Sequence, residues 1–305
     1  MIKNEKVKLG IKIVIGLIFC VSAILKLVSI DKFELYIYSF NIVNLNLSFI
    51  IARLVIAAEL GLGIGFIINC FHKFFRLLYI IALLFFSSIL IYAWIIGKTG
   101  NCHCFGELFD LNPAQSLIKN AALFIALLLI KDVKEFNFKY KKLIVTAAML
   151  GCLLTVFIVS PPDNFNLYKH KKYDVNVELL ENQLNTPPLS ADNLCAGRKM
   201  LCFYTTKCEY CILTANKISL IQQNNNINTT CIFNIFWGEE ADLPNFYMKS
   251  GASHYNYDFI NVIDFLKITN GVMPIVLLME DGNIIKQYDY RNIDENYIVE
   301  FFIRN

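Results

Sequence analysis

Five long apolar runs in the first 160 residues constrain the fold more than any other feature of this chain. Most of them approach the length, about 20 residues, that a helix needs to cross the hydrocarbon core of a bilayer. The chain is 56% hydrophobic and only 17% charged, and a large soluble core would not require such long uncharged stretches. The runs predict transmembrane helices at 11–30, 49–70, 77–97, 113–130 and 143–159.

The fourth helix is predicted to begin at Pro113, although its first turns are polar. Asn112 is a favoured helix cap, and proline is favoured at the first helical position. We expect the long side chain of Lys119 to reach the membrane interface. The fifth helix should stop at Pro161-Pro162, because proline interrupts a helix. The first run lacks a small-x-small cleavage motif, so we interpret it as a retained helix rather than a signal peptide.

The distribution of basic residues predicts the orientation in the membrane. Most of them flank alternate ends of the runs: Lys3, Lys6, Lys8, Lys12, Lys73, Arg76, Lys131, Lys134, Lys139, Lys141 and Lys142. The opposite loops hold only Lys32, Lys98 and Lys119. Because basic loops stay in the cytoplasm, we expect an inner-membrane protein with a cytoplasmic N-terminus and an extracytoplasmic, periplasmic C-terminal domain. A net charge of +3 is too small to suggest a nucleic-acid partner.

The second half of the chain predicts an α/β domain. Residues 161–185 are polar and flanked by prolines, so we interpret them as a linker between a membrane domain at 1–160 and a domain at 186–305. Strand patterns at 198–206 and 229–237 enclose a helical pattern at 211–223, and 243–251 and 257–269 are wholly or partly helical. Two further strands meet at Asp281-Gly282, a strong hairpin signal, before a terminal amphipathic helix.

Cys208 and Cys211 form a C-x-x-C motif where the first strand passes into the first helix of this domain. A thiol at a helix N-terminus faces unpaired N–H groups and the positive end of the helix dipole, which favour the thiolate. We expect Cys208 to attack and Cys211 to resolve the mixed disulfide. A purely structural disulfide stays an alternative, as does a zinc site with ligands such as Cys231 and His254.

Cys102 and Cys104 form a second close pair, in the segment NCHCFG between the third and fourth apolar runs. Gly100 and Gly106 on either side permit a tight turn. A Cys-x-Cys disulfide closes a small, strained ring, and strained disulfides are more oxidising and more labile. That property suits a transfer site. The pair could instead hold a soft metal such as Cu(I) together with the intervening histidine, or have no function.

The C-terminal half resembles a thioredoxin-fold domain over roughly 186–305. The resemblance rests on the strand order, on Cys208-Glu209-Tyr210-Cys211 and on the GVMP segment before the hairpin. It implies that Pro274 is a cis-proline facing the redox pair. The family often has a buried acid six residues before the first cysteine, where this chain has Cys202. The usual proton relay is therefore in doubt.

The first 130 residues resemble the DoxX-like membrane family, specifically its MauE (methylamine utilisation) branch. The matching segments are GLIFCVSAILKL, AAELGLGIGF and NCHCFGELFD with IKNAALFIALLL. The resemblance implies a four-helix membrane unit that supports disulfide chemistry outside the cytoplasm. The expected fold is therefore an α-helical membrane bundle, a four-helix unit plus a fifth transmembrane helix, followed by an α/β thioredoxin-like domain.

These features predict a membrane-anchored thiol–disulfide oxidoreductase that passes electrons between the two cysteine pairs. The expected partners are exported cysteine-containing client proteins or another thiol–disulfide carrier, and no cofactor is assigned. The alternatives are a copper chaperone or assembly factor, or a non-catalytic scaffold that tethers a thioredoxin-like module. Among the ionisable residues within spans, Glu59 is expected to pair with Lys26 or Arg53 beneath the Cys-x-Cys loop, or to play a packing role.

Overall fold

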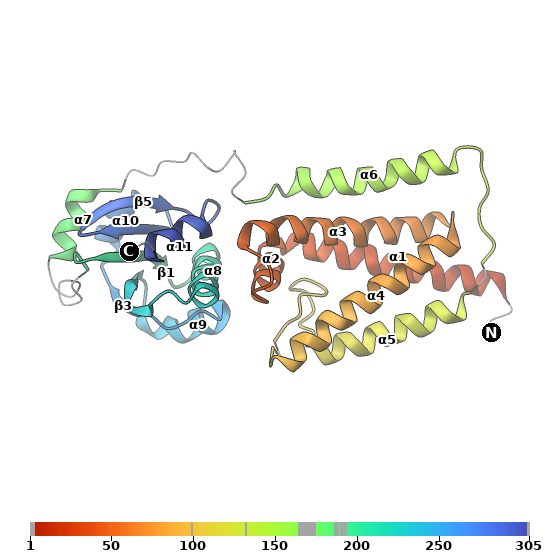
Figure 1. Ribbon diagram of the computed structural model, residues 1–305, viewed down its shortest axis with the longest axis horizontal. Helices are drawn as coiled ribbons and strands as arrows, with labels where there is room; N and C mark the ends of the chain where they lie inside the picture. Colours follow the sequence, from red (N-terminus) through yellow and green to blue (C-terminus); the bar gives the residue numbers. More distant parts are fainter. Residues whose placement is uncertain are drawn as a thin grey trace. The chain divides into compact units, whose positions relative to one another are not determined.

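The computed structural model describes residues 4–98, 100–131, 133–163, 175–185, 189 and 194–303. The chain divides into two compact units (Figure 1). The helical unit comprises Met1–Ile37 and Leu47–Pro162, and the α/β unit comprises Tyr38–Asn46 and Asp163–Asn305.

All five predicted apolar runs are helical. The helices are α1 (Glu5–Val28), α2 (Ile30–Tyr38), α3 (Leu45–Ile68), α4 (His72–Ile95), α5 (Pro113–Leu129) and α6 (Lys141–Val159). Four of them, α1, α3, α4 and α6, are long and apolar enough to cross a membrane, whereas α5 has 17 residues. The short α2 was not expected. Asn112 caps α5 as predicted, with its side chain accepting a hydrogen bond from Gln115 N–H.

Helices α1 and α3 approach closely where glycines replace larger side chains. A Cβ atom on Gly63 would lie 2.5 Å from Cys20 Sγ and 2.8 Å from Gly16 O. Small residues are the usual way for membrane helices to bring their backbones together. Arg53 of α3 is fully buried, pairs with Glu34 and donates to the carbonyl of Ser160 at 2.7 Å.

The α/β unit contains a five-stranded sheet in the order β3-β2-β1-β4-β5. Its elements are α7 (Val177–Leu184), β1 (Arg198–Thr205), α8 (Glu209–Asn225), η2 (Thr229–Cys231), β2 (Ile232–Trp237), η3 (Glu240–Asp242), α9 (Leu243–Ser250), β3 (Asn256–Phe259), α10 (Val262–Thr269), β4 (Ile275–Glu280), β5 (Asn283–Tyr288) and α11 (Glu295–Ile303). Strands β1, β2 and β3 are parallel, and β4 is antiparallel to both β1 and β5. Asp281 and Gly282 have positive φ in the predicted hairpin turn.

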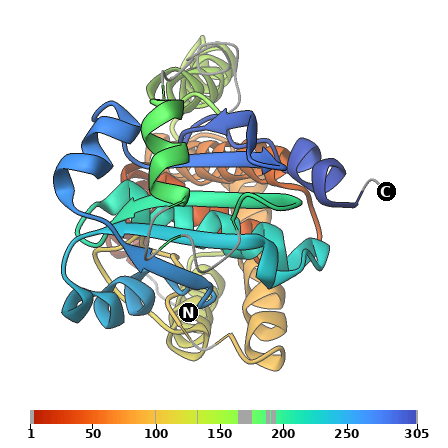
Figure 2. The same cartoon turned by 90° about the vertical axis from the view of Figure 1, so that its left-hand side faces the viewer.

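Helices cover both faces of this sheet. Alternate strand residues such as Leu201 and Leu277 share one buried cluster with Leu180 of α7 and Phe265 of α10. Figure 2 shows α7, in bright green, crossing the strands of the sheet. On the other face, Tyr204 and Phe236 both contact Phe246 of α9. The predicted fold class, membrane helices followed by a thioredoxin-like α/β domain, is therefore confirmed.

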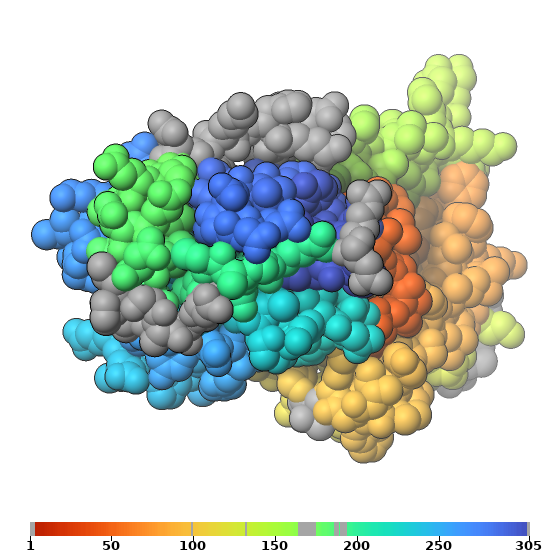
Figure 3. Space-filling view, turned by 60° about the vertical axis from the view of Figure 1, so that its left-hand side comes forward, coloured from red at the N-terminus to blue at the C-terminus, as the bar shows by residue number. Residues whose placement is uncertain are grey.

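Three local expectations differ from the structure. The segment assigned to a linker at 161–185 contains α7, which packs on the sheet because Leu180 and Leu184 bury their side chains there (Figure 3). Pro187 and Pro188, assigned to the lead-in, lie outside the described residues. The start of the predicted helical segment 257–269 belongs to β3, a strand defined by its pairing with β2. Cys231 lies in η2 rather than within a strand.

Candidate active site

The C-x-x-C motif lies where β1 leads into α8. The strand ends at Thr205, whose carbonyl accepts a hydrogen bond from Cys208 N–H at 3.3 Å. Cys208 is the N-cap of α8, and its Sγ accepts a hydrogen bond from Cys211 N–H at 3.3 Å. The sulfur thus takes the position that a serine or aspartate oxygen usually holds at a helix start.

The two thiols of this motif differ strongly in acidity. A hydrogen bond from the Cys211 side chain, assisted by the N–H groups of Cys211 and Tyr210, lowers the pKa of Cys208 to about 6 despite partial burial. Burial, followed by the effect of the Cys208 sulfur, raises the pKa of Cys211. Cys208 is partly exposed and Cys211 is buried. This arrangement provides an accessible thiolate with a protonated thiol behind it.

Pro274 lies directly before β4, and the Met273–Pro274 peptide bond is cis, as the thioredoxin resemblance implies. In the antiparallel register Ile275 pairs with Phe203. Pro274, just before it, therefore lies at the end of the sheet where β1 finishes and the chain continues to Cys208. Cys202, at the position of the missing acid, is fully buried in β1. Burial raises its pKa to about 12, so this thiol cannot replace a carboxylate as a proton acceptor near neutral pH.

A buried ion pair behind the motif was not predicted from the sequence. Lys217 Nζ, on α8, lies 3.0 Å from Asp163 Oδ2 and donates to Tyr290 O at 2.9 Å. The ring of Tyr290 in turn lies 5.4 Å from that of Tyr210, which stands between the two cysteines. The sequence contains one indication of this ion pair, a lysine within the apolar pattern of α8. Its partner, Asp163, could not be identified because it is distant in the sequence.

The C-x-C loop, residues 96–112, is closed by its own side chains. Asn101 Nδ2 donates to Gly106 O at 3.3 Å and to Asp110 Oδ1 at 2.7 Å. Gly106 has φ +58°, and a Cβ atom there would lie 2.5 Å from Leu25 O of α1. A glycine is therefore required at this position both by the backbone conformation and by the close approach to α1.

The two cysteines of this loop also differ in environment. Cys102 is 2% exposed, and its Sγ lies 3.0 Å from Oγ of the buried Ser116 on α5. A hydrogen bond from the Cys104 side chain lowers the pKa of Cys102 to about 6, with a smaller effect of Ser116 in the same direction. The pKa of Cys104, which is partly exposed, is raised because its thiol donates that bond. Ser116 was missed in the sequence because nothing there placed it beside Cys102.

A buried ion pair supports the loop from below. Lys26 Nζ donates to both carboxylate oxygens of Glu59, at 3.0 and 2.8 Å, and to the carbonyl oxygen of Cys104 at 2.7 Å. Ser22 Oγ also donates to Cys104 O, at 2.8 Å. The predicted Lys26–Glu59 pairing is therefore present, and it fixes the backbone of the second cysteine. The alternative partner, Arg53, pairs with Glu34 instead.

His103 faces the carboxylate of Glu107. Its Nδ1 lies 3.1 Å from Glu107 Oε1, and Glu107 also pairs with Lys32 at 2.7 Å. The contact with His103 is the largest of the effects that lower the pKa of Glu107 to about 2. In the described part of the chain, no group of three or more His, Cys, Asp or Glu residues is arranged to hold a metal ion.

The structure thus brings together the cysteines within each predicted pair. Cys102 and Cys104 belong to the helical unit, and Cys208, Cys211 and Pro274 belong to the α/β unit. All ten cysteines are free thiols. Each pair combines one thiol of lowered pKa with one of raised pKa, and a thiol of lowered pKa supplies the thiolate that thiol–disulfide exchange uses.

Comparison with known proteins supports both halves of this description. Residues 4–131 match the family described as methylamine utilisation protein MauE. Protein TlpB of Flavobacterium psychrophilum is 28% identical to this chain, and the match covers 94% of this chain and 92% of that protein. A MauE-like membrane region is therefore joined here to a thioredoxin-like domain, and the chain is a multi-pass membrane protein.

A solved structure also matches part of the chain. It is a secreted Mycobacterium tuberculosis disulfide oxidoreductase homologous to E. coli DsbE, with 14% sequence identity and a TM-score of 0.27. The match covers 35% of this chain and 80% of that one. Because this score is low, the thioredoxin-like fold rests on the strand order and on the C-x-x-C motif at the start of α8.

The acidity of Cys208 can be measured by alkylation of the reduced full-length protein across a pH series. We expect the alkylation rate of Cys208 to rise with a midpoint near pH 6, following its pKa of about 6. Cys211→Ala should move the midpoint toward the ordinary thiol value of about 8.5, because it removes the main stabilising hydrogen bond. Cys231→Ala, the matched control, should leave the midpoint unchanged. A wild-type midpoint above pH 8 would contradict the assignment.

The support of the C-x-C loop can be tested by substituting the ion pair. Lys26→Met leaves the carboxylate of Glu59 buried without its cation, so we expect a loss of about 3–5 kcal/mol in stability. Lys26→Met/Glu59→Leu should recover most of this loss, yet Cys104 should be alkylated faster than in wild type because its carbonyl has lost a donor. The readouts are thermal unfolding in detergent and mass-spectrometric labelling.

The exposed Lys6 of the same helix provides the matched control, and Lys6→Met should change neither readout. Equal unfolding temperatures for wild type and Lys26→Met would show that the pair does not support the loop.

Proposed function

We propose that this protein is a thiol–disulfide oxidoreductase of the cell envelope, in which the MauE-like membrane region and the thioredoxin-like domain exchange electrons. The observation that supports this most strongly is that each unit holds two neighbouring cysteines, one of them buried and the other partly exposed. In each, a hydrogen bond from the partner thiol lowers one pKa to about 6. The thiol of lowered pKa is the partly exposed Cys208 in the thioredoxin-like domain and the buried Cys102 in the membrane region, so the two pairs can take complementary parts in one exchange.

The reaction at the thioredoxin-like domain follows from the exposure of its two thiols. The Cys208 thiolate attacks one sulfur of a client disulfide, a mixed disulfide forms, and the client releases its first thiolate. Cys211 then loses its proton and attacks Cys208 Sγ, which releases the second client thiolate and leaves a Cys208–Cys211 disulfide. Two electrons pass to the client. The same steps run in reverse when the client is oxidised.

The C-x-C pair returns the first pair to its starting state by the same chemistry. Cys104 is the partly exposed thiol, so we assign it to the mixed disulfide with Cys208. It loses its proton and attacks Cys208 Sγ of the Cys208–Cys211 disulfide, which breaks that bond and releases Cys211 as a thiolate that takes up a proton. The buried Cys102 thiolate then attacks Cys104 Sγ, which releases Cys208 and forms a Cys102–Cys104 disulfide. Ser116 holds the Cys102 sulfur in place for this attack. A further thiol–disulfide carrier would exchange two electrons with the Cys102–Cys104 pair.

This exchange requires both pairs to lie in one compartment. The basic residues that flank the helices favour a cytoplasmic N-terminus, and five spans would then put both pairs on the opposite side. Helix α5 has 17 residues. Lys119 Nζ lies 4.7 Å from the ring centroid of Phe105, a residue of the C-x-C loop, so its side chain is directed toward that loop. A short helix with a cation at its loop end can complete a fifth span. Exported cysteine-containing proteins are the clients that this topology favours.

The order of the sulfurs can be tested by trapping. In full-length Cys102→Ser/Cys211→Ser protein both resolving thiols are absent, so we expect mild oxidation with copper–phenanthroline, which accepts the two electrons, to give a disulfide between Cys104 and Cys208. Peptide mapping without reductant detects it directly. The matched variant Cys104→Ser/Cys211→Ser keeps only the buried Cys102 and should give at least about tenfold less cross-link, because a buried sulfur is inaccessible. Equal yields would contradict the assignment of Cys104, and no cross-link in either variant would contradict the exchange itself.

A further inference from the structure

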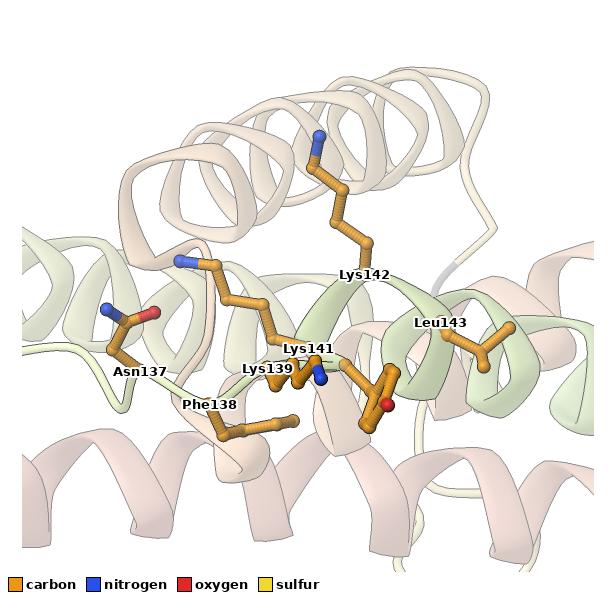
Figure 4. A pocket seen from close by; sticks show the side chains of 7 residues that line it. Asn137, Phe138, Lys139, Lys141, Lys142 and Leu143 are labelled. Atoms are coloured by element: carbon orange, nitrogen blue, oxygen red, sulfur yellow. The ribbon is translucent and has the colours of Figure 1, made fainter.

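A basic hollow lies at the start of α6, in the segment that follows α5. It has a volume of about 590 Å³ and is lined by consecutive residues, Asn137 to Leu143. Figure 4 shows these side chains around the point where the connecting segment enters the first turn of α6. The proposed redox chemistry uses none of them.

The hollow is positively charged. Lys139, Lys141 and Lys142 line it, and no carboxylate of the described residues forms an ion pair with any of the three. Between 133 and 142 the one acidic residue is Glu135, whose carboxylate accepts a hydrogen bond from His72 N–H at 2.9 Å. Lys139 Nζ lies 5.5 Å from the ring centroid of Tyr140 and Lys141 Nζ lies 5.2 Å from that of Phe71. These rings do not neutralise the ammonium groups, which can still attract an external anion.

The surroundings indicate that this anion is attached to an apolar molecule. Helix α6 continues from the hollow with exposed apolar side chains, including Leu143 at 68% and Leu150 at 55% exposure. Phe138 and Tyr140, which also line the hollow, are 37% and 59% exposed. Aromatic and basic residues at the end of an apolar helix are typical of the boundary between lipid and water. The hollow thus combines a phosphate-binding charge with a surface suited to acyl chains.

We propose that this hollow binds the phosphate headgroup of an anionic phospholipid, with the acyl chains lying along α6. The lysine ammonium groups neutralise the phosphate, and the aromatic side chains pack beside the glycerol region. A free phosphate ion would use the lysines alone and gain nothing from the apolar face of α6. The site does not depend on the thiol chemistry, so either proposal can fail without the other.

The test compares lipid binding by full-length protein in detergent, measured by native mass spectrometry with phosphatidylglycerol and phosphatidylcholine of equal chain length. We expect wild type to bind phosphatidylglycerol about tenfold more tightly. K139Q/K141Q/K142Q should lose this preference, whereas K139R/K141R/K142R should keep it because the charge is retained. The charge-matched control K199Q/K249Q/K267Q in the α/β unit should behave like wild type.

Two further results separate the sources of the anion. Inorganic phosphate at millimolar concentration should leave the bound phosphatidylglycerol in place, and its displacement would assign the hollow to a free anion. An equal affinity of wild type for both lipids, or an unchanged preference in K139Q/K141Q/K142Q, would overturn the proposal. If that triple variant does not fold, the single variant K141Q should still reduce the preference, and an unreduced preference would likewise overturn it.

Discussion

The Lys26–Glu59 ion pair is the interaction on which the membrane thiol site depends. A buried ammonium and a buried carboxylate are each unfavourable in an apolar bundle, so they must satisfy one another. Here the lysine also donates to the carbonyl oxygen of Cys104, so the same contact that neutralises the bundle interior fixes the loop. Gly106 permits the approach, because any side chain at that position would collide with the backbone of α1. The polar C-x-C loop is thereby fixed to the end of the membrane helices.

In each cysteine pair one thiol has a lowered pKa, and different structural features lower it in the two pairs. In the α/β unit the helix start supplies N–H groups to Cys208, and the sheet and helix core bury Cys211. In the helical unit no helix begins at the cysteines, and Ser116 and the neighbouring thiol provide the hydrogen bonds to Cys102. The more acidic thiol is the accessible one in the first pair and the buried one in the second. We therefore infer complementary roles: Cys208 attacks partners, whereas Cys102 resolves the disulfide formed by Cys104.

The sequence predicted those features that arise from local chemistry. Length and hydropathy indicate the apolar helices, the Asn112-Pro113 step marks the start of α5, and Asp281-Gly282 marks the hairpin. Features that depend on distant partners were not predictable from one sequence. Ser116 and Asp163 become part of a site only through tertiary contacts, and β3 exists as a strand only because β2 pairs with it. Helix α7 was assigned to a linker because its few buried leucines are spaced among polar residues.

The central claim, that the two pairs exchange electrons, is tested most directly by the redox state of Cys208 and Cys211 in cells. Rapid acid quenching followed by labelling with a mass-tagged maleimide reports the oxidised fraction of this pair. Removing the membrane pair with Cys102→Ala/Cys104→Ala should shift that fraction strongly toward one extreme, and the direction of the shift gives the direction of electron flow. An oxidised fraction identical to that of wild type would contradict the account.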